Sequence, residues 1–383
     1  MFSTDSSTFS LPHPPSSLTS IGTHPQHHLF AISLLQPPSP SADPNNISVV
    51  LFDEEDNEIK HLSTWSTSSE VTRINSSKTQ AEDKDGLLSL STRTFDPTTS
   101  KHSYSTLACS LPGLTASIDR VSSGSDDRES DASGSANVSV LLEVPHDCVA
   151  VSSAVVGGTD LYSLTTSSVS THDLQSGSSV NSFATSDCYG NTSFSTDPHN
   201  PSVLTVGTSR SILSYDCRSG KCTGGVKEGH KYRVEDVDYN PHRPYYLVSG
   251  GRDGSVRFWD IRFAGNSVSS TAPTRVLEGH DHWVTSVRYN PFHDQLVSSS
   301  GTDGSVGLWR VSSVSSAPIM ALSETTNPSV LPDARVEVFR NHDESVRGMD
   351  WSACDAWCVA SAGWGGTVVV DHVGSEEKYR ILL

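Results

Sequence analysis

Two segments of this chain, 50 residues apart, carry nearly the same order of residues. The first opens at Gly229-His230 and the second opens at Gly279-His280. Each continues through a Tyr-Asn-Pro string, a Leu-Val-Ser string and an Asp-Gly-Ser-Val string to a Trp that follows the His by 29 residues. Self-similarity at a fixed period means that one supersecondary unit is stacked several times. The repeat therefore constrains the fold more tightly than any other feature of the sequence.

Within each repeat the residues are typical of short antiparallel strands. Val256 alternates with Phe258 in the first copy, and the second copy repeats this alternation, which places apolar side chains on one face of a strand. The Asp-Gly pair before each strand predicts a tight hairpin turn, because Gly tolerates a positive φ. The order and period of the units resemble the WD40 repeat, in which one repeat corresponds to one propeller blade. We therefore expect an all-β fold that consists of a single WD40 β-propeller.

The length of the chain suits seven blades. Seven units of roughly 40–45 residues would use about 280–315 residues, and the chain has 383. The clear units are at residues 227–265, 277–315 and 337–372. Two degenerate units precede them, back to about residue 160, and residues 21–155 have room for two more. Seven is therefore the best count of blades.

Three segments are expected to lie outside the regular strands. Residues 1–20 are rich in Ser, Thr and Pro and predict a disordered N-terminal arm, so that the propeller would span residues 21–383. A Ser/Asp-rich stretch at about 122–139 has almost no apolar residue and predicts a protruding loop. Residues 312–332 are expected to form an insertion between two blades.

The WD40 resemblance implies a hydrogen-bond network inside each blade. In that family a His, a Ser, the turn Asp and the Trp of the blade form it. Carried over by motif position, the two sets are His230, Ser249, Asp253 and Trp259, and then His280, Ser299, Asp303 and Trp309. In the third unit, which opens at Asn341-His342, Gly365 replaces the turn Asp and Asp371 replaces the Trp.

These sets are interpreted as structural and not as catalytic. A His, a Ser and an Asp also make up a hydrolase triad, but a triad occurs once in an enzyme, whereas this set recurs in both clear repeats. Apart from these sets, the sequence offers no candidate for an activated nucleophile. We therefore expect no catalytic residue and no enzyme activity.

Charge and cysteine spacing disfavour several classes of protein. The formal net charge is −18, from 26 basic and 44 acidic residues, which opposes binding to nucleic acid or anionic bilayers because such binding depends on Lys and Arg. The seven Cys include no Cys-x-x-Cys pair, so they predict reduced thiols in the cytosol and not a disulfide framework or a zinc knuckle. No run approaches the ~18 apolar residues of a membrane span, so no integral membrane segment is expected.

Two short strings resemble ligand sites but are better explained otherwise. His280-Asp281-His282 resembles a metal cluster, but it lies in the loop that enters a blade. The string from Gly301 to Gly304 is a hairpin turn and not a phosphate-binding loop, because neither a Lys nor a helix follows it. We expect no metal site and no cofactor.

Propellers of the WD40 family commonly bind partners at the narrow rim of the ring. In that family the rim holds the residues three and five positions after the blade His and the residue before the turn Asp. Here these positions are Arg233, Glu235 and Arg252, then Trp283, Thr285 and Thr302, and finally Ser345, Arg347 and Trp364. Trp and Arg are enriched among residues that dominate binding energy. We therefore expect a partner-binding rim on these blades.

The last 150 residues or so carry a more specific resemblance. Its strings include His282-Trp283-Val284, Val287-Arg288-Tyr289-Asn290, Asn341-His342-Asp343-Glu344-Ser345-Val346, Asp350-Trp351-Ser352 and the ending Lys378-Tyr379-Arg380-Ile381-Leu382-Leu383. Together they resemble the EARP- and GARP-complex-interacting protein family, and the first half of the chain departs from that pattern. The resemblance implies a non-enzymatic adaptor of these vesicle-tethering complexes. It would act in endosomal recycling, endosome-to-Golgi retrograde transport and dense-core vesicle biogenesis. Its place would be the cytoplasm, peripherally at the trans-Golgi network and endosomes.

A second class of function remains open. Trp259, Asp260 and Arg262 form a W-D-x-R string. It resembles the box of substrate receptors in cullin-RING ubiquitin ligases, where the Arg contacts the adaptor propeller. A third, weaker interpretation is a histone-binding propeller that attracts basic tails through its net charge of −18. The partners recovered with the protein would distinguish these classes.

Overall fold

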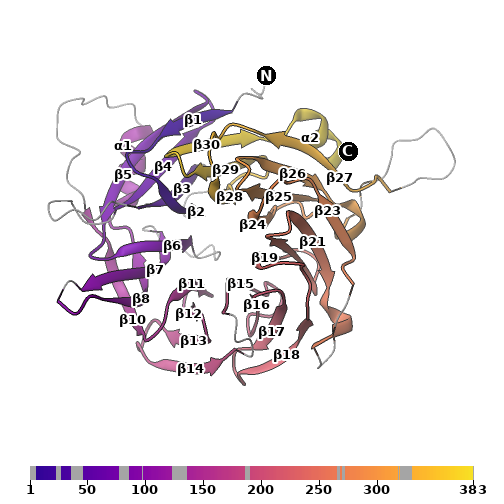
Figure 1. Cartoon of the computed structure of the whole chain (residues 1–383). Helices are drawn as coiled ribbons and strands as arrows, with labels where there is room; N and C mark the ends of the chain where they lie inside the picture. Colours follow the sequence, from indigo (N-terminus) through magenta and orange to yellow (C-terminus); the bar gives the residue numbers. More distant parts are fainter. Residues whose placement is uncertain are drawn as a thin grey trace.

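The computed structural model describes residues 6–22, 27–35, 46–76, 86–96, 98–122, 136–185, 190–264, 268–269, 272–317, 319 and 330–382. In this part of the chain the strands form seven sheets, which lie around a common axis like the blades of a propeller (Figure 1). The all-β fold and the count of seven blades are confirmed.

The first three blades come from the half of the chain without a clear repeat. Blade 1 contains β2 (Pro15–Ile21), β3 (His28–Leu34), β4 (Asn46–Asp53) and β5 (Glu58–Ser66), and the short β9 (Ala136–Asn137) pairs with β5. Blade 2 contains β6 (Glu70–Ser76), β7 (Leu87–Asp96), β8 (Lys101–Ser110) and β10 (Ser139–His146). Blade 3 contains β11 (Ala150–Val156), β12 (Asp160–Thr165), β13 (Ser168–Asp173) and β14 (Ser179–Ala184).

The other four blades include the clear repeats. Blade 4 contains β15 (Ser193–Thr196), β16 (Val203–Gly207), β17 (Ile212–Asp216) and β18 (Lys221–Val226), with the short β22 (Val268–Ser269) beside β18. Blade 5 contains β19 (Val234–Tyr239), β20 (Tyr246–Gly251), β21 (Ser255–Asp260) and β23 (Arg275–Glu278). Blade 6 contains β24 (Val284–Tyr289), β25 (Leu296–Gly301), β26 (Val306–Arg310) and β27 (Ala334–Phe339). Blade 7 contains β28 (Val346–Trp351), β29 (Cys358–Gly363), β30 (Thr367–His372) and β1 (Ser7–Ser10).

The N-terminal strand closes the ring. β1 pairs antiparallel with β30, with Ser7 opposite Val370 and Ser10 opposite Thr367. A disordered arm was expected over residues 1–20, but within it the structure places β1 and most of β2, while residues 1–5 lie outside the described residues. The Pro-rich composition is misleading because Pro12 and Pro14 fall in the connection between the two strands. Pro15 is the first residue of β2, where a missing N–H is tolerated.

Each blade buries side chains against its neighbours. The first strand of every blade contacts the first strand of the next blade all around the ring. Behind these strands, Phe30 and Phe52 of blade 1 share a core cluster with Val368 of blade 7. Phe258 of blade 5 packs edge-on against Tyr289 of blade 6. Among the described residues, each core cluster therefore draws side chains from two neighbouring blades.

The segments expected outside the strands are placed as follows. Of the Ser/Asp-rich stretch, residues 123–135 lie outside the described residues, with α1 (Leu114–Ser122) before them and β9 and β10 after them. Residues 312–332 were expected between two blades, but β26 and β27, on either side of them, belong to the same sheet. The insertion therefore lies within blade 6. The predicted Asp-Gly turns are present, and Gly254 and Gly304 have φ values of 73° and 74°.

Candidate functional site

The residues that the two repeats share form a chain of hydrogen bonds inside blade 5. His230 Nε2 lies 2.7 Å from Ser249 Oγ, and the Trp259 indole N–H donates to the same oxygen over 2.8 Å. His230 Nδ1 lies 3.0 Å from an Asp253 carboxylate oxygen. With a proton on His230 Nδ1, each group donates to the next: Trp259 to Ser249, Ser249 to His230, and His230 to Asp253.

Blade 6 repeats this geometry, and blade 7 varies it. The contacts of Ser299 Oγ are 2.7 Å to His280 Nε2 and 2.7 Å to Trp309 Nε1, and His280 Nδ1 lies 3.1 Å from Asp303. In blade 7, His342 contacts Ser361 Oγ at 2.8 Å through Nε2 and Thr367 Oγ1 at 3.0 Å through Nδ1. Thr367 therefore takes the role of the turn Asp that Gly365 leaves vacant.

The electrostatics of these networks suit a structural role. Burial lowers the pKa of His230, against the opposing effect of Asp253. Burial alone would raise the pKa of Asp253, but the hydrogen bonds with His230 and Ser255 hold it well below its usual value. The imidazole is thus neutral and the carboxylate ionised at pH 7. Ser249 is fully buried, and its oxygen is hydrogen-bonded to both His230 and Trp259. A substrate therefore cannot reach it.

The predicted rim residues of blades 5 and 6 touch one another. The Arg252 guanidinium lies over the Trp283 ring, 4.3 Å from its centroid, and its Nε donates to Glu235. Arg233 lies 3.6 Å from the same carboxylate. The Trp283 side chain remains 40% exposed, so a neighbouring molecule can still contact the ring.

The contacts continue into blade 7. The Thr302 N–H donates to the Trp283 carbonyl over 2.9 Å, and the Ser345 hydroxyl donates to the Thr302 carbonyl over 3.2 Å. The Trp364 N–H donates to the Ser345 carbonyl over 2.8 Å, and the Arg347 guanidinium lies 4.6 Å from the centroid of the Trp364 ring. Trp364 is 39% exposed. We call the nine predicted residues of blades 5 to 7 the rim cluster.

Thr285 completes the rim cluster, and His282 extends it. The Thr285 hydroxyl donates to the Val346 carbonyl over 2.9 Å, next to Arg347. The His282 ring stacks on Trp283 with centroids 4.9 Å apart, and its Nδ1 contacts Thr302. The His-Asp-His string was noted in the sequence only as an unconvincing metal cluster. His280 belongs to the blade network and His282 to the rim, so these two rings have separate roles.

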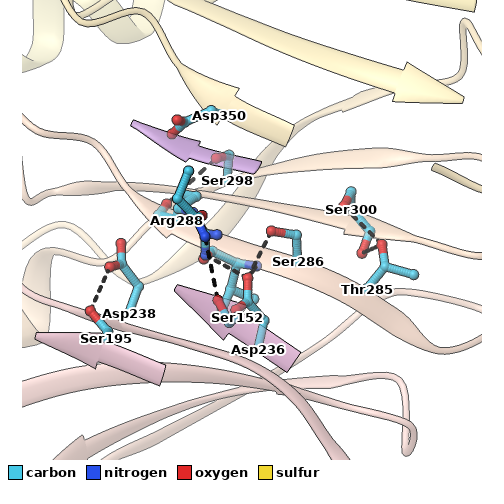
Figure 2. Close-up of polar contacts among 12 residues, drawn as sticks. Ser152, Ser195, Asp236, Asp238, Thr285, Ser286, Arg288, Ser298, Ser300 and Asp350 are labelled. Carbon is cyan, nitrogen blue, oxygen red and sulfur yellow. Dashed lines mark hydrogen bonds and ion pairs between the residues drawn. The ribbon is translucent and has the colours of Figure 1, made fainter. Parts of the chain in front are cut away.

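A buried ion-pair network lies beside the rim cluster, at the inner strands (Figure 2). Asp236 of β19 is 1% exposed and accepts hydrogen bonds from Arg288 of β24 and from the Ser286 hydroxyl at 2.8 Å. Arg73 of β6 reaches the same carboxylate at 3.3 Å. Burial alone would raise the pKa of Asp236, but Arg288 and Arg73 lower it. No pattern in the sequence predicts this link, because Arg73 and Asp236 are 163 residues apart and Arg73 lies outside the clear repeats.

The W-D-x-R string has a different local geometry. Trp259 is buried in the blade 5 network, whereas the Arg262 side chain is 48% exposed. Arg262 donates through Nε to Asp260 over 2.9 Å and through Nη2 to the Tyr246 hydroxyl over 3.2 Å. The Arg thus folds back on its own blade, and a partner would have to compete with Asp260 for it.

In the part of the chain that the structure describes, no helix is both long enough and apolar enough to cross a membrane.

Comparisons with known proteins agree with this architecture. Residues 159–309 match the family model described as the EIPR1 beta-propeller, and residues 334–370 match the model of the WD domain, G-beta repeat. The EARP and GARP complex-interacting protein 1 of Macaca fascicularis is 30% identical over 365 residues, covering 88% of this chain and 90% of that protein.

Two further relatives each align with about half of this chain. The Homo sapiens protein of the same name is 30% identical over 198 residues, which cover 48% of this chain and 50% of that protein. The EARP-interacting protein 1 of Caenorhabditis elegans is 31% identical over 191 residues, covering 48% of this chain and 51% of that protein. With a propeller of seven blades and a relative aligned over nearly its whole length, this chain belongs to the EARP and GARP complex-interacting protein family of WD-repeat β-propellers.

Proposed function

We propose that this chain is a non-enzymatic scaffold that binds subunits of the EARP and GARP vesicle-tethering complexes through its rim cluster. Membership of the family supports the choice of partner, because its named members are interacting proteins of these complexes. The proposed setting is endosomal recycling and endosome-to-Golgi retrograde transport. The protein would act in the cytoplasm, peripherally at endosomes and the trans-Golgi network.

The observation that carries the proposal is the pair of Arg–Trp contacts in the rim cluster. Trp283 under Arg252 and Trp364 under Arg347 are each about two-fifths exposed, yet a cation covers part of each ring. A stacked Arg restrains an aromatic side chain, so less conformational entropy is lost when a partner binds. Half-exposed Trp and Arg side chains are the type of residue that dominates binding energy.

The charged side chains of the rim cluster indicate which kind of partner segment it would bind. The chain has a net charge of −18, but the rim cluster contains Arg233, Arg252 and Arg347 against a single carboxylate, Glu235. Three guanidinium groups beside two exposed Trp rings suit a partner segment that combines acidic and apolar side chains.

The test is affinity purification of the tagged protein from a gentle lysate, with mass spectrometry of the bound proteins. Wild-type protein is expected to recover the tethering-complex subunits, and the double variant Trp283→Ala/Arg347→Ala is expected to lose them. The matched control is Arg218→Ala/Tyr379→Ala, which removes an Arg and an aromatic that are 77% and 64% exposed outside the rim cluster. Equal recovery by the rim variant would contradict the proposed surface.

The second candidate, a substrate receptor of a cullin-RING ubiquitin ligase, rests on the exposure of Arg262. The same purification tests it. Recovery of a cullin and its propeller adaptor, lost in Arg262→Ala but kept in the rim variant, would replace the first proposal with this one.

A further inference from the structure

Three side chains from opposite ends of the sequence meet where blade 1 adjoins blade 7. His28 is the first residue of β3, Glu54 follows β4, and Cys358 is the first residue of β29. One donor atom from each of them lies within 4.8 Å of the other two. The closure of the ring brings these residues together, because Glu54 and Cys358 are 304 residues apart in sequence.

Two of the three donor separations, those that involve Glu54, are close to the edge lengths of a metal coordination tetrahedron. His28 Nε2 lies 3.1 Å from Glu54 Oε1, and Cys358 Sγ lies 3.7 Å from the same oxygen. Zinc bonds of about 2.0 Å to N and O and about 2.3 Å to S would place neighbouring donors roughly 3.3–3.6 Å apart. The side chains would therefore need only small movements to bind one ion.

Neighbouring side chains contact two of the three donor residues, His28 and Cys358. His28 Nδ1 lies 2.8 Å from the Ser352 hydroxyl, a contact to the other ring nitrogen of the kind that fixes metal-binding imidazoles. Asp355 Oδ2 and His372 Nδ1 lie 3.5 Å and 3.3 Å from Cys358 Sγ, and both contact this donor from outside the group of three. Cys358 is buried, whereas Glu54 is half exposed and leaves the site open to solvent.

We propose that His28, Glu54 and Cys358 bind one transition-metal ion, for which Zn²⁺ is the best match, and that this ion ties blade 1 to blade 7. A nitrogen, a thiolate and a carboxylate suit zinc better than Mg²⁺ or Ca²⁺, which prefer oxygen ligands alone. The ion would reinforce the closure of the ring, to which β1 contributes a strand of only four residues. The expectation of no metal site came from spacing along the sequence, which cannot reveal ligands from opposite ends of a chain.

Zinc titration of tag-free, chelator-treated protein tests the site. One equivalent of Zn²⁺ is expected to bind to the wild type. Glu54→Gln is expected to weaken the affinity at least about tenfold, the size of effect that disturbing even an outer-shell partner has. Glu55→Gln is the matched control, since it removes the adjacent exposed carboxylate. Both side chains are exposed, so neither substitution is expected to affect folding.

Cobalt substitution identifies the sulfur ligand. Co²⁺ bound to the wild type is expected to show a thiolate-to-metal charge-transfer band that Cys358→Ala lacks and that Cys109→Ala, at a buried cysteine outside the site, retains. Wild-type protein that binds no stoichiometric zinc would overturn the proposal. Zinc binding that is equally tight in Glu54→Gln, or a charge-transfer band that persists in Cys358→Ala, would also overturn it.

Discussion

At the scale of single residues, the Ser at the centre of the networks in blades 5 and 6 contacts both a Trp and a His. Ser299 Oγ contacts the Trp309 indole and the His280 imidazole, both at 2.7 Å, and is fully buried. A buried polar group that loses its partner costs free energy because no water replaces the partner. Removal of the Ser or the His, the two inner members of such a network, therefore leaves two other members without a partner.

His280→Ala is expected to lower the free energy of unfolding by about 1–3 kcal/mol, because Ser299 and Asp303 would each lose a partner. Urea denaturation followed by Trp fluorescence measures it. His102→Ala is the control, since that side chain is exposed and outside the networks, and its effect should stay within about 0.5 kcal/mol. An unchanged midpoint in His280→Ala would contradict the structural role of the network.

The sequence predicts these residues to the extent that they are repeated. The His, Ser, Asp and Trp of blades 5 and 6 lie at fixed positions in two copies of one string, so the resemblance locates all of them. Thr367 could not be found in this way, because blade 7 replaces the turn Asp with a different residue at a different position. Arg73 and Cys358 contact residues that are 163 and 304 positions away in the sequence, and a single sequence carries no periodic signal for such contacts.

At the scale of elements, β1, the strand that closes the ring, could not be predicted from composition. β1 is a four-residue strand of Ser, Thr and Phe, and such a segment satisfies its backbone only by pairing with β30. Behind this pairing, Asp371 of β30 is 1% exposed and accepts hydrogen bonds from the Ser6 hydroxyl at 2.6 Å and the Asn341 amide at 2.8 Å. Burial raises the pKa of Asp371 to about 6, although both hydrogen bonds lower it.

This carboxyl makes stability depend on pH. Its pKa is higher in the folded state than the ordinary value of 3.8, so the folded state binds the proton more tightly. The stability it contributes is present below about pH 4 and is lost as the pH rises through about 6. Asp371→Asn should therefore stabilise the protein by on the order of 1–3 kcal/mol at pH 8 and leave it unchanged at pH 4.

Thermal unfolding of Asp371→Asn and wild type across this pH range measures the effect. Asp343→Asn, at an exposed neighbour of the same blade, serves as the control. A difference between Asp371→Asn and wild type that does not change with pH would show that the carboxyl does not titrate in this window.

At the scale of the whole molecule, ion pairs between blades hold the ring together from the inside. Asp236 of blade 5 is linked to Arg288 of blade 6 and to Arg73 of blade 2. The negative charges of Asp238 and Asp350 also raise the pKa of Arg288. The Arg288 guanidinium of blade 6 thus compensates carboxylates of the two neighbouring blades, 5 and 7, and its loss would leave buried negative charge.

Arg288→Met is expected to lower the free energy of unfolding by roughly 3–5 kcal/mol, the cost of leaving a buried charge without its partner. Denaturant titration measures it, with Arg218→Met as the control at an arginine that is 77% exposed. The double variant Arg288→Met/Asp236→Asn should recover part of the loss, because it removes a carboxylate with the cation. A double variant that is less stable by the sum of the single effects would contradict this explanation.

The proposed role of the whole molecule is to bind the tethering complexes through its rim cluster. The most direct test is the affinity of purified wild-type protein and of Trp283→Ala/Arg347→Ala for purified EARP and GARP complexes, measured by calorimetry. The rim variant is expected to lose at least about 2 kcal/mol of binding free energy, roughly 30-fold in Kd, while its melting temperature matches that of wild type. Equal affinity of the two proteins would contradict the claim.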